Sequence, residues 1–427
     1  MKSKLSDDLP DLVAHHIISE ETALKIQAYF DSKHVDAPNR LFMVFGVLGA
    51  LLIGLGVILI LAHDWDNFPR SLKTLLAFLP LIIGQGLVGY TILKKKSATW
   101  REASGTFLFF AVGSSISLVS QIYNIPGDLS AYVLTWVILC MPLIYLLKSH
   151  AVAILHLVFS TFYASSLGYD GFGVAPWYYL LLLAIVLPYY INLLKHQPQS
   201  NRVSIFNWLL PLSVIITLGT FLQEHGEMGY VMYVILFGIF YNIGRLPQFA
   251  VQKLRRNGYV VLGSVGTVVM LLIMSFNGVW DFEWDAALFA SHEFLMTIVV
   301  YAMGLALLIY LHKKRLVQYI NLFHYVFIIF VIVFFSGMGN NVVATVIVNL
   351  LVLVLGLITI KFGADKLHFG ILNYGLVILT ALIVSRFFDT DMSFAIRGLL
   401  FVVVGVGFFA TNYVMLKKKK ATGTPKL

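Results

Sequence analysis

The chain repeats one unit along most of its length, an apolar run of about 18 to 22 residues followed by a short polar loop. A helix needs about 20 residues to cross the roughly 30 Å of hydrocarbon in a bilayer. Lipid offers no hydrogen-bond partners to an open backbone, so such runs must be helical. They predict an all-α, polytopic membrane protein with about 14 transmembrane helices. The predicted spans are 41–62, 72–93, 103–123, 130–147, 150–168, 176–194, 203–222, 229–247, 258–276, 293–311, 317–336, 341–360, 368–388 and 394–415.

The composition excludes a water-soluble globular protein. Of the 427 residues, 59% are hydrophobic and only 12% are charged, against about 25% charged in soluble domains. The single cysteine, Cys140, excludes an intramolecular disulfide. The chain has no His-x-x-x-His, Cys-x-x-Cys or Gly-x-Ser-x-Gly pattern, so we expect neither a metal site nor a cofactor.

The charges of the loops predict the orientation of the chain. With the N-terminus in the cytoplasm, 26 of the 30 Lys and Arg residues fall at the inner face, as the positive-inside rule requires. An odd error in the span count would move every later loop to the other side, so we expect both termini in the cytoplasm. The net charge of +9 is therefore explained by cations that orient the chain in the membrane. Because the basic residues are scattered over many loops, nucleic acid is not an expected partner.

Three regions are expected along the chain. Residues 1–40 form a short cytoplasmic helical hairpin, in which Ser19 caps a helix with Glu20 and Glu21 in its first turn. Residues 41–416 form the multi-pass transmembrane domain, and residues 417–427 form a basic cytoplasmic tail that is expected to lie at the lipid head groups.

The outer face holds the four cations that orientation does not explain. Arg70 and Lys73 belong to one outer segment, residues 63–73, and the other two cations belong to a second segment, residues 386–397. One hypothesis is that the two segments meet and form a site for a polar or anionic head group, with arginines as donors and aspartates as acceptors.

A local interpretation of the same residues is equally open. Asp66 or Asn67 would cap the second span, Trp65 would lie in the interfacial aromatic belt, and Arg386 would pair with Asp389 one helical turn later.

A third outer segment ends the span 103–123. Ser114, Ser117 and Gln121 fall on one helical face, which predicts a polar stripe. Such a stripe either forms hydrogen bonds between helices or lines a cavity that opens outward. The complete set of candidate ligand-binding residues is His63, Asp64, Trp65, Asp66, Arg70, Gln121, Tyr123, Arg386, Asp389 and Arg397.

Polar residues also occur within the spans. His156 and His324 are functional candidates because of their position, although a neutral histidine that forms a hydrogen bond to a neighbouring helix costs little. Asparagines such as Asn207, Asn242 and Asn349 are expected to hold helices together.

Several of these residues resemble a known family. The Gly-rich segment 49–56 leads into Ala-His-Asp-Trp at 62–65, and Gln121-Ile122-Tyr123 is followed by Trp136. Arg386-Phe387-Phe388-Asp389 precedes Arg397-Gly398. This pattern resembles the bacterial membrane family labelled domain of unknown function 2157, in which Asn is usual at the position of Asp64. The resemblance implies a bacterial inner-membrane protein with a cytoplasmic N-terminus. It also implies a periplasmic partner, because relatives are sometimes encoded beside, or joined to, a periplasmic protein named for a Gly-Asp-Tyr motif.

Three functions are consistent with the sequence. The leading one is binding or transport of a polar or amphipathic small molecule, or a lipid, through a site that opens to the extracytoplasmic face. The second is a membrane-embedded enzyme for a lipid-linked substrate, with Asp64 or Asp66 as base, His63 as acid or as an orienting group, and Arg386 and Arg397 holding the anionic group. The third is a non-catalytic scaffold for a periplasmic protein.

Overall fold

A computed structural model describes residues 12–34, 65–169, 174–282, 286–316, 321–337 and 340–389, with Leu9 and a few positions between 398 and 413. Within these residues every regular element is a helix. The first predicted span, 41–62, and most of the last, 394–415, lie outside the described residues. The chain divides into two compact units, Met1–Leu76 and Ala77–Leu427.

The first unit contains the helix α2 (Glu20–His34), which begins where its sequence predicts. The backbone N–H of Thr22 donates to Ser19 Oγ at 3.3 Å, and Glu20 and Glu21 occupy the first turn. Glu21 also forms an ion pair with Lys25 at 2.6 Å. Before this helix, residues 12–14 are helical, and His16 adopts a positive φ of 55°.

Nine helices of the described residues are long and apolar enough to cross a membrane. They are α4 (Arg70–Leu93), α5 (Ala98–Tyr123), α6 with α7 (Leu129–Cys140 and Pro142–Leu147), α8 (His150–Gly168), α9 (Tyr178–His196), α10 with η2 (Asn201–Leu218 and Gly219–Phe221), α14 (His292–Lys313), α16 (Asn341–Asp365) and α17 (Phe369–Asp389).

Three shorter apolar helices accompany them, α11 (Met228–Gly244), α13 (Gly258–Ile273) and α15 (Val326–Ser336). Each of the twelve predicted spans from 72–93 to 368–388 therefore coincides with a helix or a broken helix. Short elements fill the connections: α12 (Pro247–Ala250), η1 (Trp65–Asn67), η3 (Leu254–Arg256), η4 (Asn277–Trp280), η5 (Ala286–Ala290) and η6 (Leu322–His324).

The shortest predicted loop, at residues 148–150, is a helix-to-helix turn. Lys148 closes α7 in the left-handed conformation, with φ 50°. Ser149 then caps α8 by accepting the backbone N–H of Val152. Glu102 of α5 accepts from the Ser149 hydroxyl and from the backbone N–H groups of His150 and Ala151. Lys148 and Ser149 suffice to connect the two helices because a side chain from another helix satisfies the new helix terminus.

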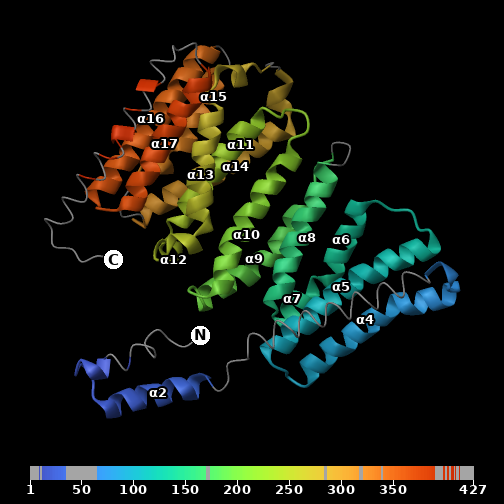
Figure 1. The fold of residues 1–427 in the computed structure, drawn as a ribbon. Helices are drawn as coiled ribbons and strands as arrows, with labels where there is room; N and C mark the ends of the chain where they lie inside the picture. Colours follow the sequence, from blue (N-terminus) through green and yellow to red (C-terminus); the bar gives the residue numbers. More distant parts are fainter. Residues whose placement is uncertain are drawn as a thin grey trace. The chain divides into compact units, whose positions relative to one another are not determined.

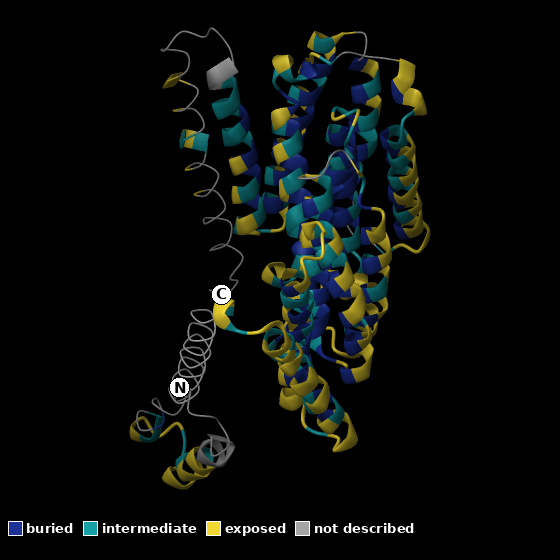
Figure 2. Ribbon diagram, turned by 90° about the vertical axis from the view of Figure 1, so that its right-hand side faces the viewer, coloured by how far each residue is buried: buried dark blue, intermediate teal, exposed yellow. Residues whose placement is uncertain are grey.

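The second unit has two large hydrophobic cores, and Figure 1 labels the helices that contribute to them. One is built mainly from α5 to α10 and the other mainly from α11, α13, α15 and α16. Helix α11 supplies buried residues to both, including Met232 to the first and Met228 to the second. Figure 2 shows the buried residues between the helices and many exposed residues on their outward faces.

Polar side chains connect the helices as the sequence predicts. His156 of α8 lies 2.9 Å from the carbonyl oxygen of Leu182 in α9. His324 Nδ1 lies 2.7 Å from Asn242 Oδ1, and both histidines are buried. The Asn349 side chain donates to the carbonyl of Ser275 at 2.9 Å. These contacts support a packing role for the intramembrane histidines and asparagines.

Candidate functional site

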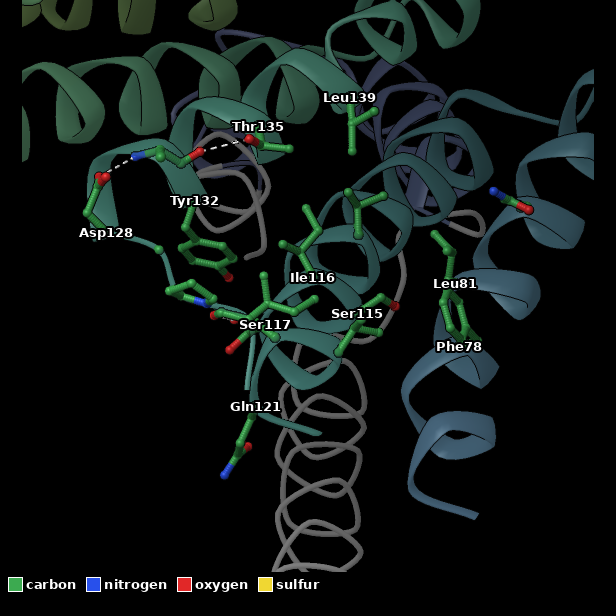
Figure 3. A pocket seen from close by; sticks show the side chains of 18 residues that line it. Phe78, Leu81, Ser115, Ile116, Ser117, Gln121, Asp128, Tyr132, Thr135 and Leu139 are labelled. Carbon is green, nitrogen blue, oxygen red and sulfur yellow. Dashed lines mark hydrogen bonds between the residues drawn. The ribbon is translucent and has the colours of Figure 1, made fainter. Parts of the chain in front are cut away.

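A cavity of about 900 Å³ lies among α4, α5 and α6 in the second unit. We call it the α4–α6 cavity. Figure 3 shows Phe78 and Leu81 of α4 on one side of α5 and Tyr132 of α6 on the other. Its polar lining residues include Gln85, Ser117, Ser120, Gln121, Asp128 and Thr135, and its apolar ones include Phe78, Leu81, Val112, Ile116, Tyr132 and Leu139.

Polar groups gather at one end of this cavity because of the turn between α5 and α6. Asn124 ends α5 in the left-handed conformation, with φ 50°. The Ser120 hydroxyl donates to the carbonyl of Ile125 at 2.9 Å, and Ser120 O accepts the N–H of Ile125 at 2.9 Å. These bonds fold the segment against the end of α5, and Pro126, Gly127 and Asp128 then line the cavity.

Asp128 carries the negative charge at this end. Its carboxylate accepts from the Ser130 hydroxyl and from the backbone N–H of Ala131, which makes it the N-cap of α6. These two hydrogen bonds hold the pKa of Asp128 below its ordinary value, and the bond from Ser130 has the larger effect. The carboxylate therefore stays ionised as the pH falls to the ordinary pKa of an aspartate. The N-cap of α6 weakens only at still lower pH.

Close packing beside this cavity holds α4, α5 and α6 together. The Ser115 hydroxyl donates to the carbonyl of Ala77, which joins α5 to α4. The Trp136 indole N–H donates to the carbonyl of Phe109 at 2.6 Å. Gly113 permits this approach, because a Cβ there would lie 2.3 Å from the Trp136 ring. Trp136, one of the residues that carry the family resemblance, thus has a packing role.

The predicted polar stripe of α5 is only partly found in the cavity. Ser117 and Gln121 line it, but Ser114 does not, and Ser120 lines it in addition. Tyr123 lies at the end of α5 with 51% of its surface exposed. Of the ten candidate residues, Gln121 is the one that the structure places in the lining of this cavity.

The candidates at residues 65–70 belong to the first unit. Lys73 Nζ lies 5.8 Å from the centre of the Trp65 ring, and Asp66 and Arg70 are exposed. Helix α4 begins directly after Pro69, whose carbonyl accepts the N–H groups of Leu72 and Lys73. His63 and Asp64 lie outside the described residues.

Arg386 lies in a different part of the second unit from Gln121. Its guanidinium donates to Ser275 Oγ at 3.1 Å and lies 4.7 Å from the centre of the Phe276 ring. It therefore ties α17 to the end of α13. The Asp389 side chain and Arg397 lie outside the described residues, so the predicted Arg386–Asp389 pair and the meeting of the two outer segments stay predictions.

A second cavity, of about 380 Å³, was not predicted from the sequence. Arg245, one of the 26 cations predicted at the inner face, lies over the Tyr241 ring and donates to its hydroxyl at 2.8 Å. The Asn321 amide donates to the same hydroxyl at 2.6 Å. Arg245 and Asn321 are distant in the sequence, so no local pattern could have indicated this cluster.

The fold defines the class of the protein: an all-α chain with many long apolar helices is a polytopic membrane protein. Residues 10–153 match the family model described as Predicted membrane protein (DUF2157), which confirms the resemblance over that region. The α4–α6 cavity lies wholly within the matched residues, because its described lining runs from Phe78 to Leu139. No curated protein and no solved structure matches the chain.

Proposed function

We propose that this protein binds an amphipathic molecule, a lipid or a lipid-like compound, in the α4–α6 cavity and moves it or presents it at the outer face of a bacterial inner membrane. The observation that carries the proposal is the lining of the cavity, which has Ser120, Gln121 and Asp128 at the α5–α6 turn and further along the helices is mainly apolar, with Gln85, Ser115 and Thr135 as its polar members. Leu139 is eleven residues beyond Asp128, which places it about 16 Å deeper along α6.

The charge of the lining favours a particular head group. Among the described lining residues, Asp128 is the charged one, and no Lys, Arg or His accompanies it. An anionic head group would be repelled by this carboxylate. We therefore expect an uncharged or cationic head group, held by the side chains of Ser117, Ser120 and Gln121. This differs from the polar or anionic head group expected from the arginines of the outer segments.

The side of the membrane follows from the charge distribution. The rule that places 26 cations in the cytoplasm puts the turn between α5 and α6 on the outer side. A periplasmic partner, as the family resemblance implies, would meet the protein on that same side.

Filling the cavity is expected to remove the bound molecule. The double variant Ile116→Trp with Thr135→Trp places two large rings on walls contributed by α5 and α6. If the rings make lipid binding less favourable by about 1.4 kcal/mol or more, the retained lipid falls about tenfold. The measurement is lipid mass spectrometry of the purified full-length protein. In liposomes, the same pair is expected to slow the exchange of a labelled lipid between leaflets.

The matched control is Ile82→Trp with Ile138→Trp. These side chains are 60% and 45% exposed and lie on α4 and α6 outside the lining, so the control is expected to retain the wild-type lipid. If wild type and both variants carry the same lipids in equal amounts, the cavity is not the binding site. Isolation with a periplasmic protein and no lipid would instead favour the scaffold function.

A further inference from the structure

A third cavity, of about 460 Å³, lies at the other end of α5 from the polar end of the α4–α6 cavity. Five helix termini meet there: the beginnings of α5, α8 and α10 and the ends of α7 and α9. Each contributes one basic side chain to the lining, namely Arg101, Lys148, His150, His196 and Arg202. We call this the basic cavity. Its described lining contains no Asp or Glu.

The carboxylate beside this cavity is already engaged. Glu102 follows Arg101 in α5, but its two oxygens accept from the Ser149 hydroxyl and from the N–H groups of His150 and Ala151. It thus satisfies the first turn of α8. In the parts of the chain that the structure describes, no carboxylate forms an ion pair with Arg101, Lys148 or Arg202.

The neighbouring donors are held in place by the protein. His150 Nδ1 forms a hydrogen bond with the Tyr189 hydroxyl, and His196 Nδ1 lies 2.8 Å from the carbonyl oxygen of Asn192. The Asn192 carbonyl can only accept, so Nδ1 of His196 is the donor and Nε2 of its neutral ring is an acceptor. When Tyr189 donates to Nδ1 of His150, Nε2 of His150 is a donor for a ligand. The lining therefore combines hydrogen-bond donors with positive charge, while the neighbouring Glu102 carboxylate is bound to the beginning of α8.

Orientation in the membrane does not explain this arrangement. The positive-inside rule requires cations on the cytoplasmic side, but it is satisfied equally well by cations spread over separate loops. Here basic side chains beside three inter-helix connections, which are up to 101 residues apart, line one cavity. Two of them are arginines, whose planar guanidinium groups can donate two parallel hydrogen bonds to phosphate oxygens.

We propose that the basic cavity binds a phosphate group, supplied either by the head group of an anionic phospholipid or by free phosphate. Ile144, Pro188 and Leu193 also line it, and they offer an apolar surface to the first part of an acyl chain. Basic pockets between transmembrane helices on the cytoplasmic side are a known means of recognising anionic head groups. This site is separate from the α4–α6 cavity and does not depend on the function proposed for it.

The test uses the full-length protein in detergent, titrated with phosphatidylglycerol, phosphatidylcholine or inorganic phosphate, with bound lipid counted by native mass spectrometry. Arg101→Gln with Arg202→Gln is expected to weaken phosphatidylglycerol binding by about tenfold or more, since charge-assisted hydrogen bonds are lost. The matched control is Lys94→Gln with Arg255→Gln, which removes two exposed cations outside the lining and is expected to keep the wild-type affinity.

The two sources of phosphate give different results. A lipid site binds phosphatidylglycerol far better than phosphatidylcholine, and inorganic phosphate displaces the phosphatidylglycerol poorly. A free-phosphate site binds inorganic phosphate directly, and the double Gln variant loses this binding. Arg101→Lys with Arg202→Lys separates charge from folding, because it keeps the charge and is expected to retain part of the affinity. The proposal is overturned if the double Gln variant binds all three probes as the wild type does, or loses no more than its control.

Discussion

Gly263→Ala is expected to be among the most destabilising single methyl additions in this protein. Helices α11 and α13 touch backbone to backbone at this glycine, and a Cβ there would lie 2.4 Å from the Tyr241 amide nitrogen and 2.7 Å from the Phe237 carbonyl oxygen. Neither atom can rotate away, so the two helices must separate. Overpacking of this kind costs about 3 kcal/mol, and small residues are what allow membrane helices to approach closely. Thermal unfolding in detergent measures the loss.

Gly89→Ala is the matched control, because a Cβ at this position of α4 has nothing within 4 Å. The methyl group there restricts the unfolded chain and favours the helix, so the melting temperature is expected to stay the same or rise slightly. Equal melting temperatures for the two alanine variants would contradict the close contact of α11 and α13.

Glu293→Ala is expected to have a comparable effect by a different physical route. Glu293, in the first turn of α14, is fully buried. Its Oε1 accepts the backbone N–H groups of Gln223 and Glu224, both at 3.0 Å, and lies 3.2 Å from His292 Nε2. Alanine leaves two backbone donors without their acceptor, which costs about 2 to 4 kcal/mol. The measurement is again thermal unfolding of the purified protein.

Two further variants distinguish this explanation from a general effect of charge removal. Glu293→Gln keeps one acceptor oxygen and is expected to lose less than half as much stability. Glu20→Ala removes an exposed acid from α2 and is expected to leave the melting temperature unchanged. A Gln variant as unstable as the Ala variant would show that the charge, and not the acceptor, holds the loop between α10 and α11.

The sequence predicted the helices well because their signal is local. Apolar runs mark twelve described spans, and Ser19 with Glu20 marks the beginning of α2 within one residue. The α6–α8 region shows what such a pattern misses: Pro142 divides one predicted span into two helices, and the turn at Lys148 depends on Glu102, which is 46 residues earlier in the chain. The partner of a helix terminus cannot be read from the segment that contains it.

The candidate sites were less predictable, since they depend on which distant segments meet. Helical periodicity predicted Gln121 together with Ser114 and Ser117. Of the two serines, only Ser117 lines the cavity. Arg386 lies against Ser275, which is 111 residues away. Arg101 and Arg202 are among the 26 cations that the orientation rule explains without any further role. Their shared cavity is a property of the folded chain alone.

Helix α11 has a consequence for how the protein responds to its lipid surroundings. Its 17 residues span about 25 Å, less than the roughly 30 Å of a typical hydrocarbon core. Most of its side chains are nevertheless buried by other helices, whereas α4 and α14 keep most of their surface uncovered. A change in bilayer thickness therefore acts on the tilt of the peripheral helices, while the central helix keeps its length and surroundings in membranes of different composition.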